Sequence, residues 1–209
     1  MGNGNDLQRY TKHDRQQHWL IAASFMLAAI SGMALFYPAF FSLSYVLGGP
    51  TWSRILHPFI GAVLFLVFFW AAKYLYRVNT MTDADRQWLR RIIDVLRNRT
   101  VGLPEVGHYN AGQKILFWSQ VYGIALMLVT GIILWQPWFA PYFPVGLVRL
   151  AALVHAVAAV VLVAGIIIHV YAVIWVKGTL RAMTRGTVTR AWAKTHHPGW
   201  YRSVSKGAR

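Results

Sequence analysis

The chain has 209 residues, of which 56% are hydrophobic and only 13% are charged, about half the charged share that is usual in soluble domains. It contains no cysteine, which excludes disulfides, thiolate-bound metals and iron–sulfur clusters within this chain. Its formal net charge of +15 would suggest nucleic acid as a partner in a soluble protein. The positions of the charges favour a lipid bilayer instead, and no nucleic-acid partner is expected.

Charged residues are absent from four long stretches, at 16–53, 55–72, 115–148 and 150–176. Each stretch, alone or with its flanking residues, is long enough for the roughly 20-residue helix that crosses about 30 Å of hydrocarbon. The first is too long for the apolar part of a cleaved signal peptide, and no small-residue cleavage site follows it. We therefore predict an all-α integral membrane protein, a four-transmembrane-helix bundle in a single domain of residues 1–209. The spans are expected at about 17–37, 53–76, 113–135 and 148–176.

Lysine and arginine gather on one side of the predicted membrane. Three precede the first span, eight lie at 73–114, and eight more lie between residue 177 and the C-terminus. The two other connections carry one each, Arg54 and Arg149. Because basic residues concentrate in cytoplasmic segments, we predict that both termini face the cytoplasm. The loop 77–112 and the basic tail 177–209 are expected on the same side.

The loop between the second and third spans contains the segment "TDADRQWLRRIIDVL", which begins at Thr82. Thr82 is a suitable N-cap, and Trp88, Ile92 and Val95 or Leu96 recur at helical spacing. This pattern predicts an amphipathic helix on the inner membrane face. The polar, turn-like segment "GHYNAGQK" follows and leads into the third span.

Four of the eight histidines lie in or at the ends of predicted spans, at His18, His57, His155 and His169. Ionisable residues inside a membrane are costly and usually functional. His155 and His169 are 14 residues apart, so they share one helix face at a separation of roughly 21 Å. The predicted topology puts His18 level with His169 inside and His57 level with His155 outside. Two imidazoles at one depth, from different helices, meet the requirement for bis-histidine ligation of haem iron.

Small residues near these histidines would leave room for a flat macrocycle, as in close helix packing. They are Ala22, Ala23, Gly61, Ala62, Ala151, Ala152, Ala156 and Gly165. The other four histidines lie in polar segments, where we expect solvated surface positions. They are His13, His108, His196 and His197. None of the predicted spans contains a carboxylate, which favours electron transfer over ion-coupled transport.

Several motifs, spread from end to end, resemble the cytochrome b556 (gamma) subunit of respiratory formate dehydrogenase. They are "HW" at His18, "RILHPF" around His57, "YNAGQK" from Tyr109, "TGIILWQPWFAPYFP", "LVHAVAAVVLVAGIIIHVYAVIWVKG" and "RAWAKTHHPGWYR". The resemblance implies a three-part assembly in the bacterial cytoplasmic (inner) membrane. An alpha subunit with a molybdenum- or tungsten-pterin oxidises formate outside, and an iron–sulfur beta subunit with a membrane helix relays the electrons. The gamma subunit delivers them through two haem b groups to menaquinone or ubiquinone near the cytoplasmic face.

The resemblance also implies roles for particular residues. His18 and His169 would ligate the inner haem iron, and His57 and His155 the outer haem iron. The quinone pocket would involve Asn110, Gly112 and Gln113, with His169 adjacent. Glycine permits close backbone approach, and the two amide side chains can hydrogen-bond a quinone carbonyl. The residues of this turn taken alone fit equally an ordinary loop whose asparagine starts the third span.

Other interpretations remain open from the sequence. The chain fits the equivalent cytochrome b subunit of another respiratory complex, such as a hydrogenase or thiosulfate reductase. It also fits a membrane anchor whose haems are only structural. A histidine-lined metal transporter belongs to a different class of protein, and a reduced-minus-oxidised spectrum would distinguish it because a transporter has no b-type band.

Overall fold

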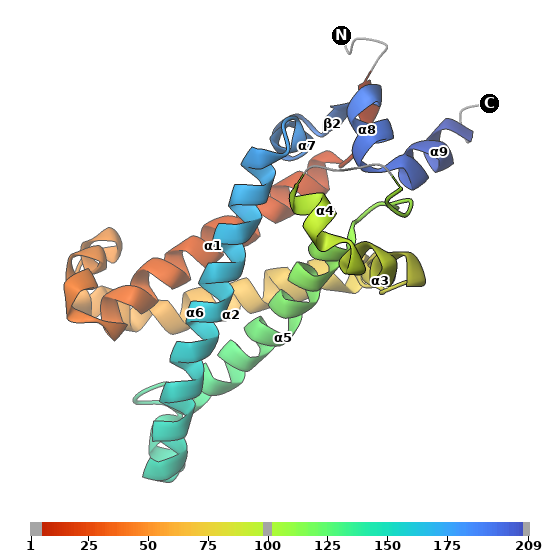
Figure 1. Ribbon diagram of the computed structural model, residues 1–209. Helices are drawn as coiled ribbons and strands as arrows, with labels where there is room; N and C mark the ends of the chain where they lie inside the picture. Colours follow the sequence, from red (N-terminus) through yellow and green to blue (C-terminus); the bar gives the residue numbers. More distant parts are fainter. Residues whose placement is uncertain (1–5, 98–101, 207–209) are drawn as a thin grey trace. The chain divides into compact units, whose positions relative to one another are not determined.

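The structure is a computed structural model and describes residues 6–97 and 102–206 (Figure 1). The elements in chain order are β1 (Asp6–Gln8), α1 (Lys12–Phe36), η1 (Pro38–Leu47), α2 (Pro50–Leu75), η2 (Arg77–Asn79), α3 (Asp83–Arg90), α4 (Ile92–Leu96), α5 (Ala111–Leu134), η3 (Ala140–Tyr142), α6 (Val145–Trp175), α7 (Thr179–Arg185), β2 (Thr187–Thr189), α8 (Arg190–His196) and α9 (Pro198–Lys206). The predicted loop 77–112 and tail 177–209 include residues 98–101 and 207–209, which lie outside the described residues.

Four helices of the described chain, α1, α2, α5 and α6, are long and apolar enough to cross a membrane. The four predicted spans are therefore confirmed as helices. Each helix begins a few residues before its predicted start, because polar and proline residues can form a first helical turn outside the apolar stretch. At α1, the backbone N–H of Thr11 donates to the Asp14 carboxylate (2.8 Å), and the Asp14 N–H donates to the Thr11 hydroxyl (3.2 Å). At α2, Pro50 occupies the first turn, where its missing N–H costs nothing.

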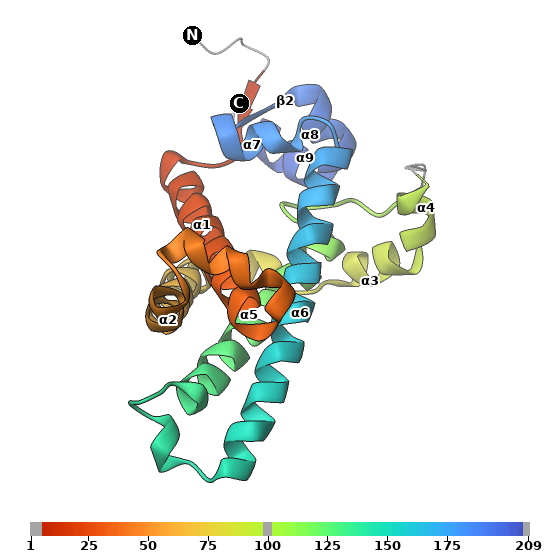
Figure 2. The same cartoon turned by 90° about the vertical axis from the view of Figure 1, so that its left-hand side faces the viewer.

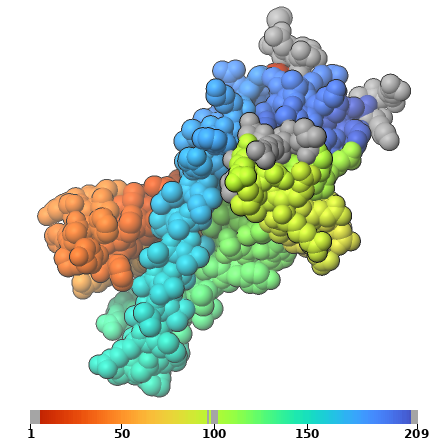
Figure 3. Space-filling view, in the orientation of Figure 1, coloured from red at the N-terminus to blue at the C-terminus, as the bar shows by residue number. Residues whose placement is uncertain are grey.

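The long helices expose apolar side chains that a soluble protein would bury. Leu66 on α2 is 66% exposed, and Val160 and Ile168 on α6 are 62% and 67% exposed. Figure 3 shows the surface of α6, drawn in cyan to blue, uncovered over much of its length. Because large exposed apolar surfaces indicate contact with lipid or protein partners, the four helices are those of a multi-pass membrane protein.

The chain forms two compact units. The first comprises Met1–Arg15, Tyr74–Trp118 and Tyr171–Arg209, and the second comprises Gln16–Lys73 and Ser119–Val170. Each of the four long helices contributes its larger part to the second unit and one end to the first. The single domain of residues 1–209 stays a prediction.

The first unit joins the N-terminal segment to the C-terminal tail. Strands β1 and β2 pair antiparallel, with Leu7 opposite Val188, and Figure 2 shows β2 beside helices α7, α8 and α9. Val188 is 1% exposed and belongs to a small apolar core. The other buried residues of that core are Ala182, Ala193 and Trp200. The described part of the basic tail is therefore folded, although its sequence predicted only a charged segment.

The predicted amphipathic helix forms as two shorter helices, α3 and α4. Thr82 is the N-cap as predicted, in a reciprocal capping box with Asp85. The backbone at Arg91 leaves helical geometry (φ −106°, ψ 22°), and this residue separates α3 from α4. Trp88 is buried at 7% exposure. The location of α3 and α4 on the membrane surface stays a prediction.

In the second unit, α5 and α6 pack closely where Gly123 faces Leu162. A Cβ atom at Gly123 would lie 2.5 Å from Leu162 Cδ2, so only glycine fits this contact without displacing the leucine. Ile124 and Leu162 are buried at 3% and 5% exposure. This contact holds together the two helices that carry Thr130 and His155.

Candidate functional site

The four membrane histidines all belong to the second unit and form two pairs. The ring centres of His18 and His169 are 6.5 Å apart, with their planes at 50°. The ring centres of His57 and His155 are 6.4 Å apart, with their planes at 70°. The structure therefore brings together the histidines that the helical spacing and topology paired.

These ring separations suit a metal ion between two imidazoles. Metal–imidazole bonds are about 2.0–2.1 Å long, so two nitrogens on opposite sides of one ion lie about 4 Å apart and their ring centres about 6 Å apart. No group of three or more His, Cys, Asp or Glu side chains in the described ranges is placed to hold a metal ion. Two axial imidazoles are instead the ligand set of a bis-histidine haem, whose porphyrin supplies the remaining donors. The residues present therefore fit a haem at each pair.

His57, on α2, is held by a serine of α1. Its Nδ1 lies 2.9 Å from the Ser31 hydroxyl, and that hydroxyl donates to the Leu27 carbonyl at 2.7 Å. The next residue is Gly32, where a Cβ atom would lie 3.2 Å from His57 Cε1. Ser31 is fully buried. The neighbouring residues Ser31 and Gly32 thus contact the edge of the His57 ring.

His155, on α6, is held in the same way by α5. Its Nδ1 lies 2.8 Å from the Thr130 hydroxyl, which donates to the Leu126 carbonyl at 2.7 Å. Gly131 follows, and a Cβ atom there would lie 3.5 Å from His155 Cε1. Neither hydroxyl–glycine pair is predictable from the sequence alone. In the sequence, each pair is visible only as a hydroxyl residue followed by glycine within an apolar helix. Many membrane helices contain such a pair, so it does not indicate a contact with histidine.

His18 has a different environment. Its buried Nδ1 has no hydrogen-bond partner among the described residues, which is rare for a buried polar atom. Its ring meets the neighbouring Trp19 ring edge to face at 5.3 Å. The two histidine pairs therefore differ in the hydrogen bonding of their rings.

The predicted quinone residues Asn110, Gly112 and Gln113 lie in the first unit, whereas His169 lies in the second. The Asn110 side-chain oxygen accepts from the Gln113 N–H (2.9 Å), and the Gln113 side-chain oxygen accepts from the Asn110 N–H (3.0 Å). The two residues thus cap α5 reciprocally, which agrees with the loop interpretation. Their side-chain NH2 groups are not used in these bonds and can donate to a ligand.

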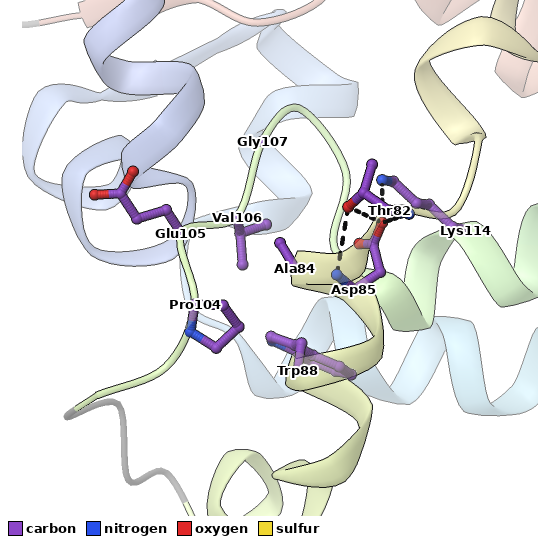
Figure 4. A pocket seen from close by; sticks show the side chains of 9 residues that line it. All are labelled: Thr82, Ala84, Asp85, Trp88, Pro104, Glu105, Val106, Gly107 and Lys114. Carbon is purple, nitrogen blue, oxygen red and sulfur yellow. Dashed lines mark hydrogen bonds and ion pairs between the residues drawn. The ribbon is translucent and has the colours of Figure 1, made fainter.

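A cavity of about 240 Å³ lies within the same unit, as Figure 4 shows. Its lining residues are Thr82, Ala84, Asp85, Trp88, Pro104, Glu105, Val106, Gly107 and Lys114. Lys114 follows the turn directly and forms an ion pair with Asp85 (2.6 Å), and both side chains are less than 10% exposed. Burial alone would raise the pKa of the Asp85 carboxyl, but Lys114 and hydrogen bonds from Thr82 hold that pKa below its ordinary value. The ion pair thus anchors the start of α5 to α3.

The prediction of solvated surface positions is correct for His13, which is exposed, but wrong for His197. His197 is 3% exposed, and its Nδ1 lies 2.9 Å from the Gly107 carbonyl oxygen. Burial and the charge of Arg9 lower the pKa of His197 to about 3, so this ring is neutral at neutral pH. His108 and His196 are partly buried. The reason is that the tail folds against the loop that carries Gly107, a tertiary contact that local polarity does not reveal.

Comparison with known proteins decides the family. The model of the prokaryotic cytochrome b561 family matches residues 9–186. The cytochrome b556(fdo) subunit of formate dehydrogenase from Escherichia coli is 43% identical over 206 residues, which cover 99% of this chain and 97% of the relative. The chain belongs to the formate dehydrogenase cytochrome b556 family.

Two further members of the cytochrome b556 family are similar over nearly their whole length. The nitrate-inducible cytochrome b556(Fdn) subunit of E. coli formate dehydrogenase is 42% identical over 92% of this chain and 89% of the relative. The Haemophilus influenzae cytochrome b556 subunit of formate dehydrogenase is 37% identical over 97% of this chain and 85% of the relative. Membership of the cytochrome b556 family, with four apolar helices, establishes a transmembrane, haem-binding cytochrome b of electron transport.

Proposed function

We propose that this chain binds two b-type haems and carries electrons from an iron–sulfur partner subunit of a formate dehydrogenase to menaquinone or ubiquinone. The observation that carries the proposal is the pairing of His18 with His169 and of His57 with His155, at ring separations of 6.5 and 6.4 Å. Haem, when bound, accepts and releases one electron at a time as its iron alternates between ferric and ferrous states.

The proposed ligands are spaced to suit transfer across a bilayer. His155 and His169 stand 14 residues apart on α6, a rise of roughly 21 Å along the helix. The hydrocarbon is about 30 Å thick, so the two pairs together span most of it. We assign His57 and His155 to the outer level, and His18 and His169 to the inner level.

We place quinone reduction at the inner level, where the "YNAGQ" turn opens α5. The NH2 groups of Asn110 and Gln113 suit the carbonyl oxygens of a quinone, and Gly112 has no side chain to obstruct it. The assignment of His169 to the quinone site stays a prediction. A quinone reduced there takes its two protons from the cytoplasm, so turnover separates charge without a proton pump in this chain.

The partners follow from the names of the relatives, which are subunits of formate dehydrogenase. We propose an alpha subunit with a molybdenum- or tungsten-pterin as the site of formate oxidation, and an iron–sulfur beta subunit with a membrane helix as the electron donor. The relatives are bacterial, and we assign the chain to the bacterial inner membrane. This chain is thus the quinone-reducing subunit of an oxidoreductase complex.

The test is the b-type absorbance of the complex purified through this chain. Formate should reduce the b-type band, and added menaquinone should reoxidise it. Reduction by hydrogen but not by formate would assign the subunit to a hydrogenase. Absence of any b-type band after dithionite treatment would overturn electron transfer and favour metal transport.

Reporter fusions test the proposed orientation. A fusion after Arg209, or within the loop 77–99, should report a cytoplasmic location, and a fusion near Gly48 should report the outside. The reason is the concentration of basic residues in the loop and the tail. A cytoplasmic reading at Gly48 would exchange the inner and outer assignments of the two pairs and move the proton source to the other side.

A further inference from the structure

We propose that Ser31 and Thr130 are positioning residues for the imidazoles of His57 and His155, and that they would lower the midpoint potential of a haem that this pair would hold. The inference rests on the proposed haem binding. It adds a difference in midpoint potential between the two proposed haem sites. Both residues act through the histidine rings and touch neither quinone nor partner subunit in the proposed mechanism.

The protons on the hydroxyls and on the imidazoles determine which group donates. A hydroxyl has one proton to donate, and Ser31 and Thr130 each donate theirs to a carbonyl of their own helix, at 2.7 Å in both cases. If Nε2 binds a metal, the neutral ring carries its proton on Nδ1, so the imidazole donates and the hydroxyl oxygen accepts, at 2.9 Å from His57 and 2.8 Å from His155. In a neutral imidazole with its proton on Nδ1, Nε2 keeps the lone pair that binds a metal.

The helices that carry the two hydroxyls also leave space for the histidine rings. The residue after each hydroxyl is glycine, and a Cβ atom at Gly32 or Gly131 would lie 3.2 or 3.5 Å from the Cε1 atom of the histidine. Cε1 lies between the two ring nitrogens, so Gly32 leaves room for the edge of the His57 ring, whereas the distance at Gly131 is an ordinary van der Waals contact. A hydroxyl residue followed by glycine thus occurs on both α1 and α5, and the two hydroxyls contact the two members of one histidine pair.

Among the described residues, the other histidine pair lacks this arrangement at His18. The buried Nδ1 of His18 has no such acceptor in the described part of the chain. A ligating imidazole that donates its second N–H becomes a stronger electron donor to the metal. Stronger donation stabilises ferric iron relative to ferrous iron and so lowers the potential. In the proposed orientation, electrons would then pass from the lower to the higher potential on their way to the inner side.

Thr130 offers a matched pair of variants. Thr130→Val keeps the shape of the side chain but removes the hydroxyl, whereas Thr130→Ser keeps the hydroxyl and removes a methyl group. In a redox titration of the purified complex, Thr130→Val should raise the midpoint potential of one haem and leave the other unchanged. We expect about a tenfold change in the ratio of ferrous to ferric iron, or about 59 mV for one electron. Thr130→Ser should stay close to the parent value.

Ser31→Ala should shift the same haem in the same direction, and Ser24→Ala, a buried serine two turns earlier on α1, is its control. Loss of that haem in Thr130→Val but not in Thr130→Ser would also support the hydroxyl. Unchanged potentials in Thr130→Val and Ser31→Ala, or equal effects of Val and Ser at position 130, would overturn the inference. A parent protein without haem would instead contradict the proposed function, and its spectrum reveals this before any variant is made.

Discussion

Alanine in place of His57 or His155 is expected to remove one haem and leave the other bound. Alanine in place of His18 or His169 should remove the other haem. The physical reason is that each iron would depend on two axial imidazoles, whose ring centres are 6.5 or 6.4 Å apart in the structure. With one imidazole missing, a low-spin bis-histidine site cannot form. The measurement is the haem content per purified chain, which should fall from two to one.

Double variants test the pairing itself. Removing both members of one pair, as in His57→Ala with His155→Ala, should cost no more haem than either single change. Removing one member of each pair, as in His57→Ala with His18→Ala, should leave no haem. His13→Ala is the control, because this histidine is exposed and should not affect the count. Two haems in all four single variants would refute the ligand assignment, and one haem left in the cross-pair double variant would refute the pairing.

Quinone reduction is expected to slow by at least about tenfold in Asn110→Asp or Gln113→Glu, which corresponds to roughly 1.4 kcal/mol. Both changes replace a side-chain NH2 donor with a carboxylate oxygen, which cannot donate to a quinone carbonyl. The haems should stay bound and reducible by the donor. Stopped-flow reoxidation of the reduced haems by added quinone provides the rate.

These substitutions are chosen because Asn110 and Gln113 also cap α5. Bulky apolar substitutions would remove the cap, at a cost of about 0.5–2 kcal/mol, and would confuse folding with quinone binding. Aspartate and glutamate keep the accepting oxygens. Thr189→Asp, a similar change at the N-cap of α8, controls for altered charge at a helix start. Normal reoxidation in both turn variants would exclude the turn from the quinone site.

The membrane helices and the histidine pairs were predictable because their signals are local. A stretch without charges long enough to cross a bilayer is visible in the sequence alone, and the confirmed helices differ from the predicted spans mainly at their capped starts. The spacing of His155 and His169 determines their common face, since helix geometry is regular. The order of the spans then predicts that His18 is level with His169 and that His57 is level with His155, and the structure pairs the rings in this way.

Other features depend on contacts between distant segments. Ser31 and Thr130 are ordinary residues of apolar helices until the partner ring on another helix is known. The burial of His197 depends on the folding of the tail against the loop that carries Gly107. The separation of α3 from α4 at Arg91 interrupts an otherwise regular amphipathic pattern. Sequence periodicity cannot specify such contacts, because each depends on how two elements meet.

The haem stoichiometry of the unaltered protein tests whether one chain holds two b-type haems in its membrane helices. A pyridine haemochrome assay on the purified chain, with protein determined by amino-acid analysis, should give two haems b per chain. The reduced-minus-oxidised spectrum should contain only b-type bands. A value of one would contradict the assignment of two sites, and the absence of haem would contradict the entire account.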